Sequence, residues 1–324
     1  FDVVKYGLRA EPTSTLTIEN SNIKAAEPVI VRKLTKGSYD ITIDNSSVLE
    51  SGNEFQIVFT NGDDGETYVI PAGTFVINDN NNFKVYPRDI IANLPYNGET
   101  KSFDAKNALG LAALVNCVNN GENDFAGFTV TLSEDIDLQG VDFQPIGTAD
   151  NKFNGTFDGQ GKTISNLKIE NDNMGAMFAY VGANTVIKNF KLENVNIKAK
   201  FAAGILSEGN DNVVVEDITV SGNVEGDSYA AGIVCLNSYN EDPAVVIKNC
   251  VNNATVSGNR SGGIAAWLTG NSVIENVVNN GNITGTTSAA GITNRIAGSI
   301  KNAKNYGTIV GNGSEASAGI AGTQ

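Results

Sequence analysis

Two short motifs recur along the chain with one shared spacing, and this repeat constrains the fold more than any other feature. A glycine followed by isoleucine, as in AAGIL and SGGIA, recurs in steps of 28, 31, 28 and 28 residues, at Gly204, Gly232, Gly263, Gly291 and Gly319. An Asn or Asp that closes an apolar-x-Asn frame recurs in steps of 23, 28, 32, 27 and 26, at Asn166, Asn189, Asp217, Asn249, Asn276 and Asn302. Two independent anchors with one period of about 28 residues predict a solenoid.

The residues inside each period are typical of strands. Runs of four to six residues rich in β-branched side chains alternate with glycine-rich turns, and helical spacing is missing. A repeat this short does not bury its own apolar face, so neighbouring copies must stack, with rungs about 4.8 Å apart. A leucine-rich repeat is the competing solenoid, but its L-x-x-L-x-L signature does not occur. We therefore predict an all-β, parallel β-helix of about 28 residues per coil over residues 103–324.

The polar residues inside the repeat follow the same register. The position three residues after each frame anchor changes from aliphatic to amide along the chain, through Leu192, Val220, Asn252, Asn279 and Asn305. Because stacked amides can donate to one rung and accept from the next, we predict an internal asparagine ladder at Asn252, Asn279 and Asn305. The anchors Asn249, Asn276 and Asn302 are predicted to form a second column near a turn. Cys250 then occupies an apolar slot and is expected to be a packing residue.

The Gly-Ile strands predict the outer surface. With Ile205 and its equivalents pointing inward, the outward column contains Tyr180, Glu208, Leu236, Trp267 and Arg295. Its aromatic and basic members, together with two further residues, predict a shallow platform on which sugar faces stack, made of Tyr180, Tyr239, Arg260, Trp267 and Arg295. The alternative is that these side chains are isolated exposed residues without a ligand, which is common on protein surfaces.

One helix is predicted, over residues 102–121. Ser102 or Asp104 is expected to cap its N-terminus, and Gly121 supplies the stop signal. Its apolar stripe comprises Ala108, Leu111, Ala112, Val115 and Val118. An open solenoid end exposes strand edges, so we expect this helix, near 103–120, to cap the stack.

The region before residue 95 is predicted to be rich in strands. Ile-x-Asn-Ser frames begin at Ile18 and Ile43, a separation of 25 residues, and further strand-like runs with turn signals follow. We interpret residues 1–95 as the last coils of a preceding β-helix, with an immunoglobulin-like sandwich as the alternative, and residues 96–102 as a linker. The chain opens on Phe1 and stops within a repeat, which suggests a segment of a longer multidomain protein.

Composition excludes several function classes. The chain has no histidine, which rules out Ser-His-Asp and Cys-His catalysis. Its net charge of −14 disfavours nucleic acid, and no apolar run is long enough to insert into a membrane. The three cysteines form no metal-binding or disulfide pattern.

A family resemblance emerges from the repeat segments. FNGTFDGQGKTISNLKI at 153–169, followed by MGAMFAYVG, IKNFKLENVNI and the AAGI and GGIA segments, resembles the GLUG-motif repeat family of bacterial surface proteins. TLSEDIDLQGVDFQPIGT at 131–148 is similar to the segment that leads into such repeats. The resemblance covers about residues 104–324, although Gly175-Ala-Met-Phe departs from the family's Gly-Leu-x-Gly core. It implies a right-handed parallel β-helix exported to the bacterial surface within an adhesin-like protein, without general catalytic residues.

Parallel β-helices also include polysaccharide lyases and hydrolases, so an enzyme is the alternative. Carboxylates that suit hydrolysis are Asp135 with Asp137, Asp63 with Asp64, and Asp158. Arg260 or Arg295 would be the base of a lyase, with Ca²⁺ as its metal. The oxygen-rich run INDNNNF at 77–83 is a possible Ca²⁺ ligand set, but an asparagine-rich turn explains it as well. We predict no metal site and no obligatory cofactor.

The sequence thus predicts a non-catalytic bacterial protein that is secreted or held at the cell surface. Its expected role is that of an adhesin-like or structural stalk that contacts extracellular glycans or surface proteins. The alternatives are a polysaccharide-active β-helix enzyme and a passive spacer without a ligand.

Overall fold

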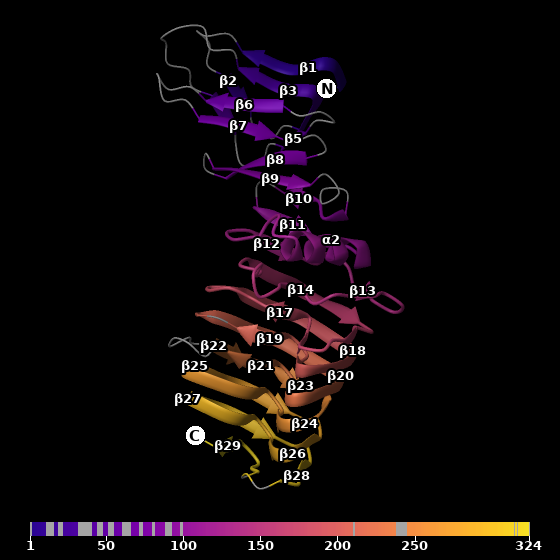
Figure 1. Ribbon diagram of the computed structural model, residues 1–324, viewed down its shortest axis with the longest axis vertical. Helices are drawn as coiled ribbons and strands as arrows, with labels where there is room; N and C mark the ends of the chain where they lie inside the picture. Colours follow the sequence, from indigo (N-terminus) through magenta and orange to yellow (C-terminus); the bar gives the residue numbers. More distant parts are fainter. Residues whose placement is uncertain are drawn as a thin grey trace. The chain divides into compact units, whose positions relative to one another are not determined.

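The computed structural model describes strand backbone between residues 2 and 87, and residues 93–324 except 98–99, 210, 238–244, 314, 316 and 324. The chain divides into two compact units, Phe1–Phe103 and Asp104–Gln324, which are described separately. Figure 1 labels the strands along the chain.

The first unit mixes parallel and antiparallel strands. Strands β1, β3 and β5 are parallel neighbours, as are β2 and β4, whereas β5–β8–β9 and β6–β7 are antiparallel. Ile18 lies opposite Ile43, so the two Ile-x-Asn-Ser frames are paired one coil apart. Parallel pairing at this offset is a β-helix feature, and the antiparallel hairpins that follow are not. The strands are β1 (Asp2–Ala10), β2 (Leu16–Ile18), β3 (Asn22–Val31), β4 (Ile41–Ile43), β5 (Val48–Glu50), β6 (Phe55–Phe59), β7 (Glu66–Ile70), β8 (Thr74–Asp79) and β9 (Asn82–Pro87).

The end of the first unit is a short antiparallel pair, β10 (Tyr96–Asn97) with β11 (Ser102–Asp104). The rings of Tyr96 and Phe103 pack against each other with centroids 4.9 Å apart. This pairing holds residues 102–104 in strand conformation, although the sequence predicted them to start the helix.

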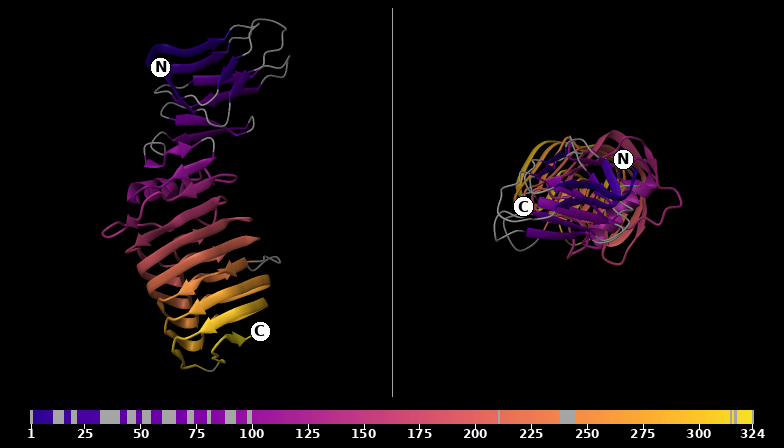
Figure 2. Two further views of the ribbon diagram at one scale, coloured as in Figure 1. Left: turned by 180° about the vertical axis from the view of Figure 1, so that it is seen from behind. Right: turned by 90° about the horizontal axis from the view of Figure 1, so that it is seen from above.

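The second unit is a mostly-β parallel solenoid of about eight turns, each of about 28 residues. Figure 2 shows the successive coils stacked along one axis. The register links equivalent residues of consecutive coils: Leu192 lies opposite Val220, and Asn252 opposite Asn279. The strands are β12 (Thr129–Thr131), β13 (Ile136–Asp137), β14 (Thr156–Ser165), β15 (Lys168–Glu170), β16 (Met174–Gly175), β17 (Phe178–Tyr180), β18 (Val186–Ala203), β19 (Leu206–Gly209), β20 (Val213–Ala231), β21 (Val234–Asn237), β22 (Val245–Lys248), β23 (Val251–Asn252), β24 (Thr255–Gly262), β25 (Ala265–Asn279), β26 (Ile283–Ala290), β27 (Thr293–Asn305), β28 (Ile309–Gly311) and β29 (Ala321–Thr323).

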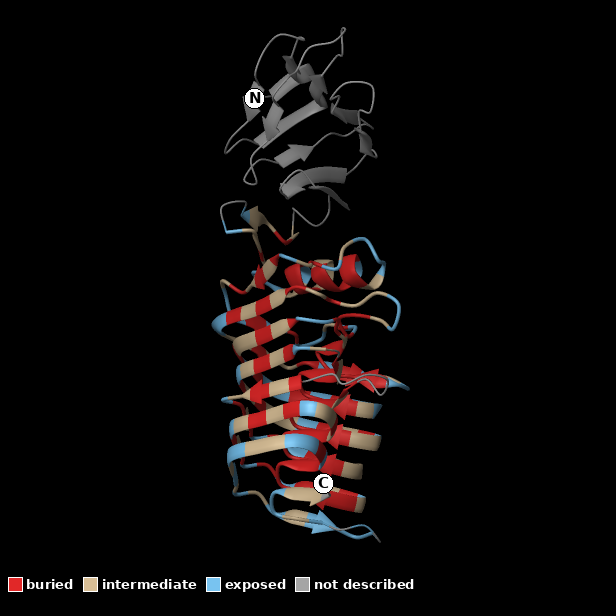
Figure 3. Cartoon of the chain, turned by 90° about the vertical axis from the view of Figure 1, so that its left-hand side faces the viewer, coloured by how far each residue is buried: buried red, intermediate tan, exposed pale blue. Residues whose placement is uncertain are grey.

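The core of the solenoid changes composition along its axis. The first coils are filled by phenylalanines in contact, with neighbouring ring centroids 5.4 to 6.0 Å apart, comprising Phe125, Phe153, Phe157, Phe178 and Phe190. Later coils substitute aliphatic side chains such as Ile233, Ile264 and Ile292, all fully buried. Figure 3 shows the alternation of buried and exposed positions along each strand, which is the period-two pattern of a sheet with one face in the core.

Helix α2 (Ala108–Asn119) begins later than predicted, and the expected cap at Ser102 or Asp104 is wrong. Asn107 is the N-cap, and its Oδ1 accepts a hydrogen bond from Gly110 N at 3.1 Å. The predicted Leu111, Val115 and Val118 are buried, together with Leu114 and Cys117, whereas Ala108 and Ala112 are only half-buried.

The two sequence anchors have different physical causes. Asn189, Asp217, Asn249, Asn276 and Asn302 all have φ between 49° and 64°, the left-handed region that Asn and Asp tolerate better than other side chains. The Gly-Ile glycines lack a positive φ and are required by space instead. A Cβ on Gly263 would lie 2.1 Å from the Gly291 carbonyl oxygen of the next coil.

Candidate functional site

The predicted outward column is one continuous line across the coils. Tyr180 lies opposite Glu208, which is followed in successive coils by Leu236, Trp267 and Arg295. Four of these side chains are partly exposed and Arg295 is exposed. Tyr239, which was predicted to join the platform, lies outside the described residues.

A second column runs beside it and was missed by the sequence reasoning. Phe201, Tyr229, Arg260 and Ser288 lie opposite one another in consecutive coils. Each stands three residues before the glycine of the Gly-Ile motif, as in FAAG and YAAG, so this fixed offset is the signal that identifies them. The two columns meet where the Tyr229 ring packs edge-on to the Trp267 ring, with centroids 5.4 Å apart.

Together these columns form a surface that we call the aromatic–basic ridge, composed of Phe201, Tyr229, Arg260, Trp267 and Arg295. The Phe201 and Tyr229 rings are stacked with centroids 5.9 Å apart and an angle of 11°. The only two arginines between residues 104 and 324 are both in this ridge. The site prediction thus brought Arg260, Trp267 and Arg295 together, whereas Tyr180 stands three coils from Trp267 in the same column.

Cations cover faces of the ridge aromatics. The Arg295 Cζ lies 4.5 Å from the centre of the Trp267 ring, and the Arg260 Cζ lies 5.8 Å from that of Tyr229. Lys200 Nζ is similarly placed 5.3 Å from the Phe201 ring centre. Each such contact stabilises the surface by about 0.5–1 kcal/mol at exposed sites. Because Arg295 covers one face of Trp267, that face does not stack on a sugar; the ridge offers ring edges and guanidinium groups.

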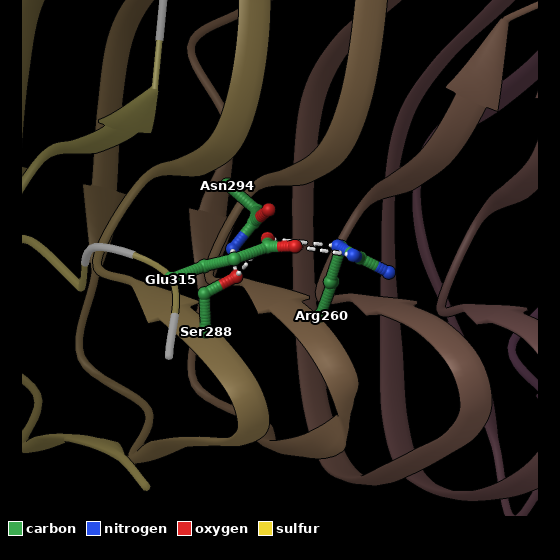
Figure 4. A network of polar contacts seen from close by, with 4 residues as sticks. All are labelled: Arg260, Ser288, Asn294 and Glu315. Atoms are coloured by element: carbon green, nitrogen blue, oxygen red, sulfur yellow. Dashed lines mark hydrogen bonds and ion pairs between the residues drawn. The ribbon is translucent and has the colours of Figure 1, made fainter. Parts of the chain in front are cut away.

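Arg260 is also the centre of a polar network (Figure 4). Its Nε donates to Glu315 Oε2 at 2.9 Å, and its Nη2 donates to Glu315 Oε1. Ser288 Oγ donates to the same carboxylate at 3.4 Å and accepts from Asn294 Nδ2 at 2.8 Å. The hydrogen bond from Arg260 lowers the pKa of the Glu315 carboxyl, so this group is ionised at neutral pH.

Tyr180 borders a hollow at the first coils. Two adjoining hollows of about 390 and 350 Å³ share Gln144, Pro145 and Asn171. Asn119 lines this surface but is used to hold the loop, because its Nδ2 donates to Pro145 O and its Oδ1 accepts from Gly147 N. Burial, and then the charge of Glu208, raises the pKa of Tyr180, which leaves its phenol neutral.

The structure places the predicted ladder asparagines in two columns. Inside the solenoid, Asn252 Nδ2 donates to Asn279 Oδ1 and Asn279 Nδ2 donates to Asn305 Oδ1, both at 2.7 Å. The outer column is made of Asn249, Asn276 and Asn302. There the donors point the other way along the axis, from Asn302 to Asn276 to Asn249, and the last bond reaches Asp217 Oδ1 at 3.0 Å.

The candidate catalytic carboxylates that the structure describes hold turns. Asp135 Oδ1 accepts from Thr163 N at 2.8 Å, and Asp137 Oδ1 accepts from Asn166 Nδ2 and Gln139 N. These bonds, chiefly that from Asn166, lower the pKa of Asp137. Asp158 accepts from Asn189 Nδ2 and Gln160 N. Asp63 and Asp64 lie outside the described residues.

The thiols and the predicted cation ligands offer little chemistry in the described structure. Burial raises the pKa of Cys117 and of Cys250 to about 12, and it also raises that of Cys235, so none of these buried thiols is a thiolate at neutral pH. Among the described residues, no group of three His, Cys, Asp or Glu side chains is placed to hold a metal ion. The INDNNNF run spans the ends of β8 and β9, and its side chains lie outside the described residues. In the described part of the chain, no helix has the length and apolarity needed to cross a bilayer.

Comparisons with known proteins support the fold more than a function. No protein-family model matches the chain. A segment of 99 residues, 29% of this chain, is 33% identical to halomucin of Haloquadratum walsbyi, and it spans 1% of halomucin's length. The chain is also similar to the solved structure of "a putative immunoglobulin A1 protease" from Bacteroides ovatus. The TM-score is 0.58 at 25% identity, and the similarity covers 68% of this chain and 71% of that one. That protein is also a β-solenoid, so the likeness bears out this architecture.

Proposed function

We propose that this chain is a non-catalytic contact module of an extracellular or surface-held bacterial protein, and that the aromatic–basic ridge contacts glycans. The observation that carries the proposal is the gathering of Tyr229, Trp267 and both arginines of the second unit on two adjacent columns. A rigid stack of coils holds these groups in fixed positions. Binding then requires little ordering of the protein.

We further propose that the solenoid is a right-handed β-helix of the GLUG type and that α2 caps its N-terminal end. The buried face of α2 supports the cap, because Leu111, Leu114 and Val118 are at most 1% exposed. Asn119 at the end of α2 also bonds the 145–147 backbone, which joins the helix to the first coils. The similarity to halomucin, whose name is that of a mucin, agrees with an extracellular setting.

Glycan-array binding of the full chain and of Trp267→Ala tests the proposed function. We expect the intact protein to bind a subset of glycans and Trp267→Ala to lose at least tenfold in affinity, because the ring supports both Tyr229 and Arg295. Tyr306→Ala is the matched control, since Tyr306 is an aromatic residue of the last coil that is 70% exposed and outside the ridge. A protein that binds no glycan, or a Trp267→Ala variant that binds as well as the intact chain, would refute the proposal.

A further inference from the structure

Arg260 binds a carboxylate of its own chain in a geometry suited to a ligand. Its Nε and Nη2 reach the two oxygens of Glu315 in parallel, which is the bidentate fork by which arginine recognises carboxylates. Ser288 Oγ adds a third donor to Oε2, and Asn294 Nδ2 orients that hydroxyl from below. Ser288 and Asn294 are 1% and 4% exposed, so the inner side of this site is rigid. Figure 4 shows the carboxylate lying between the guanidinium and Ser288.

The same contact is open to solvent on its outer side. The side chains of Arg260 and Glu315 are 31% and 41% exposed. Exposed ion pairs contribute little to stability because water and salt screen them. An external carboxylate can therefore exchange with Glu315 without a rearrangement of the coils.

The surroundings favour an acidic sugar over a simple anion. Arg260 lies against the Tyr229 ring, and beside that ring stand Trp267 and its partner Arg295. A uronic acid combines one carboxylate, several hydroxyls and an apolar ring face. Guanidinium, hydroxyl and aromatic groups on one surface match all three.

We propose that Arg260, Ser288 and Arg295 bind the carboxylate of a uronic-acid-containing polysaccharide, and that Glu315 occupies this site until the ligand displaces it. The proposal rests on the proposed glycan contact and specifies its ligand class. The net charge of −14 does not oppose it, because charges beyond about 8 Å are screened at physiological salt.

Titration with tri-galacturonate, followed by the fluorescence of Trp267, tests the proposal, since the chain contains one tryptophan. Glu315→Gln removes the competing carboxylate but keeps the side-chain shape. We expect it to bind about fivefold more tightly, the factor that corresponds to an exposed ion pair of ~1 kcal/mol. Arg260→Gln should bind at least tenfold more weakly than the intact chain. Glu193→Gln, which makes the same charge change at an exposed position of β18, should bind like the intact protein.

Two further probes separate the possible outcomes. The methyl ester of tri-galacturonate should bind at least tenfold more weakly than the acid, and penta-glutamate should bind more weakly than tri-galacturonate. The inference is overturned if Glu315→Gln fails to tighten binding, if neither protein binds the acid, or if penta-glutamate binds better. Equal binding of the ester and the acid, with loss in Trp267→Ala, would also overturn the acidic-sugar site while leaving the proposed glycan contact intact.

Discussion

The buried asparagine ladder allows a quantitative test of what stabilises the solenoid. The Asn279 side chain is fully buried and makes four hydrogen bonds. It donates to Asn305 Oδ1 at 2.7 Å and to Gly281 O at 2.9 Å, and it accepts from Asn252 Nδ2 at 2.7 Å and from Gly281 N at 3.3 Å. At about 1 kcal/mol for each net hydrogen bond, Asn279→Val should destabilise the fold by ~3–5 kcal/mol.

The double variant distinguishes a ladder from independent polar contacts. The aliphatic side chains of Leu192 and Val220 occupy the same column in earlier coils, so the space accepts Val. Asn252→Val together with Asn279→Val removes their shared bond once and leaves no orphaned amide between them. We expect the double variant to cost ~1–2 kcal/mol less than the two single variants added together.

Urea unfolding, with amide hydrogen exchange over residues 274–285, measures both effects. Exchange is needed because coils of a solenoid can open locally, which makes a single unfolding transition an incomplete measure. Asn280→Val is the control, since Asn280 is exposed and its one side-chain bond to Asn253 should contribute less than ~0.5 kcal/mol. A cost below ~1 kcal/mol for Asn279→Val, or strict additivity in the double variant, would contradict the ladder as a coupled structure.

Two smaller predictions concern the sequence anchors. Gly263→Ala should cost ~3 kcal/mol in urea unfolding, because its Cβ would lie 2.1 Å from a backbone oxygen of the next coil, whereas Gly319→Ala, with open space around the equivalent position, should cost less than ~0.5 kcal/mol; equal costs would show that the close approach is unimportant. Asn276→Ala should be about 1 kcal/mol less stable than Asn276→Gly, since φ is 54° and both variants lose the same side-chain bonds. If thermal unfolding ranks Ala above Gly, the left-handed backbone is not what selects asparagine here.

Residues that serve the repeat could be predicted because their role recurs in every coil. The inward isoleucines, the column from Leu192 to Asn305 and the outward column from Tyr180 to Arg295 all follow from period-two alternation within a period of about 28 residues. A slip of one residue would have exchanged the faces, so the register carried most of the information. The helix start could not be placed because a tertiary pairing of residues 102–104 overrode a local capping signal.

The amino-acid sequence by itself determined the solenoid, its period and the asparagine positions, since a repeat constrains each coil by its neighbours. Only the tertiary structure decided what the surface does with its charges. It showed that Arg260 reaches Glu315, 55 residues away, and that Arg295 covers Trp267 in the previous coil. Such pairs depend on where side chains lie around the coil and not on their spacing in the sequence. The physical reason is that burial repeats along the stack, whereas contacts between exposed groups are set by each coil separately.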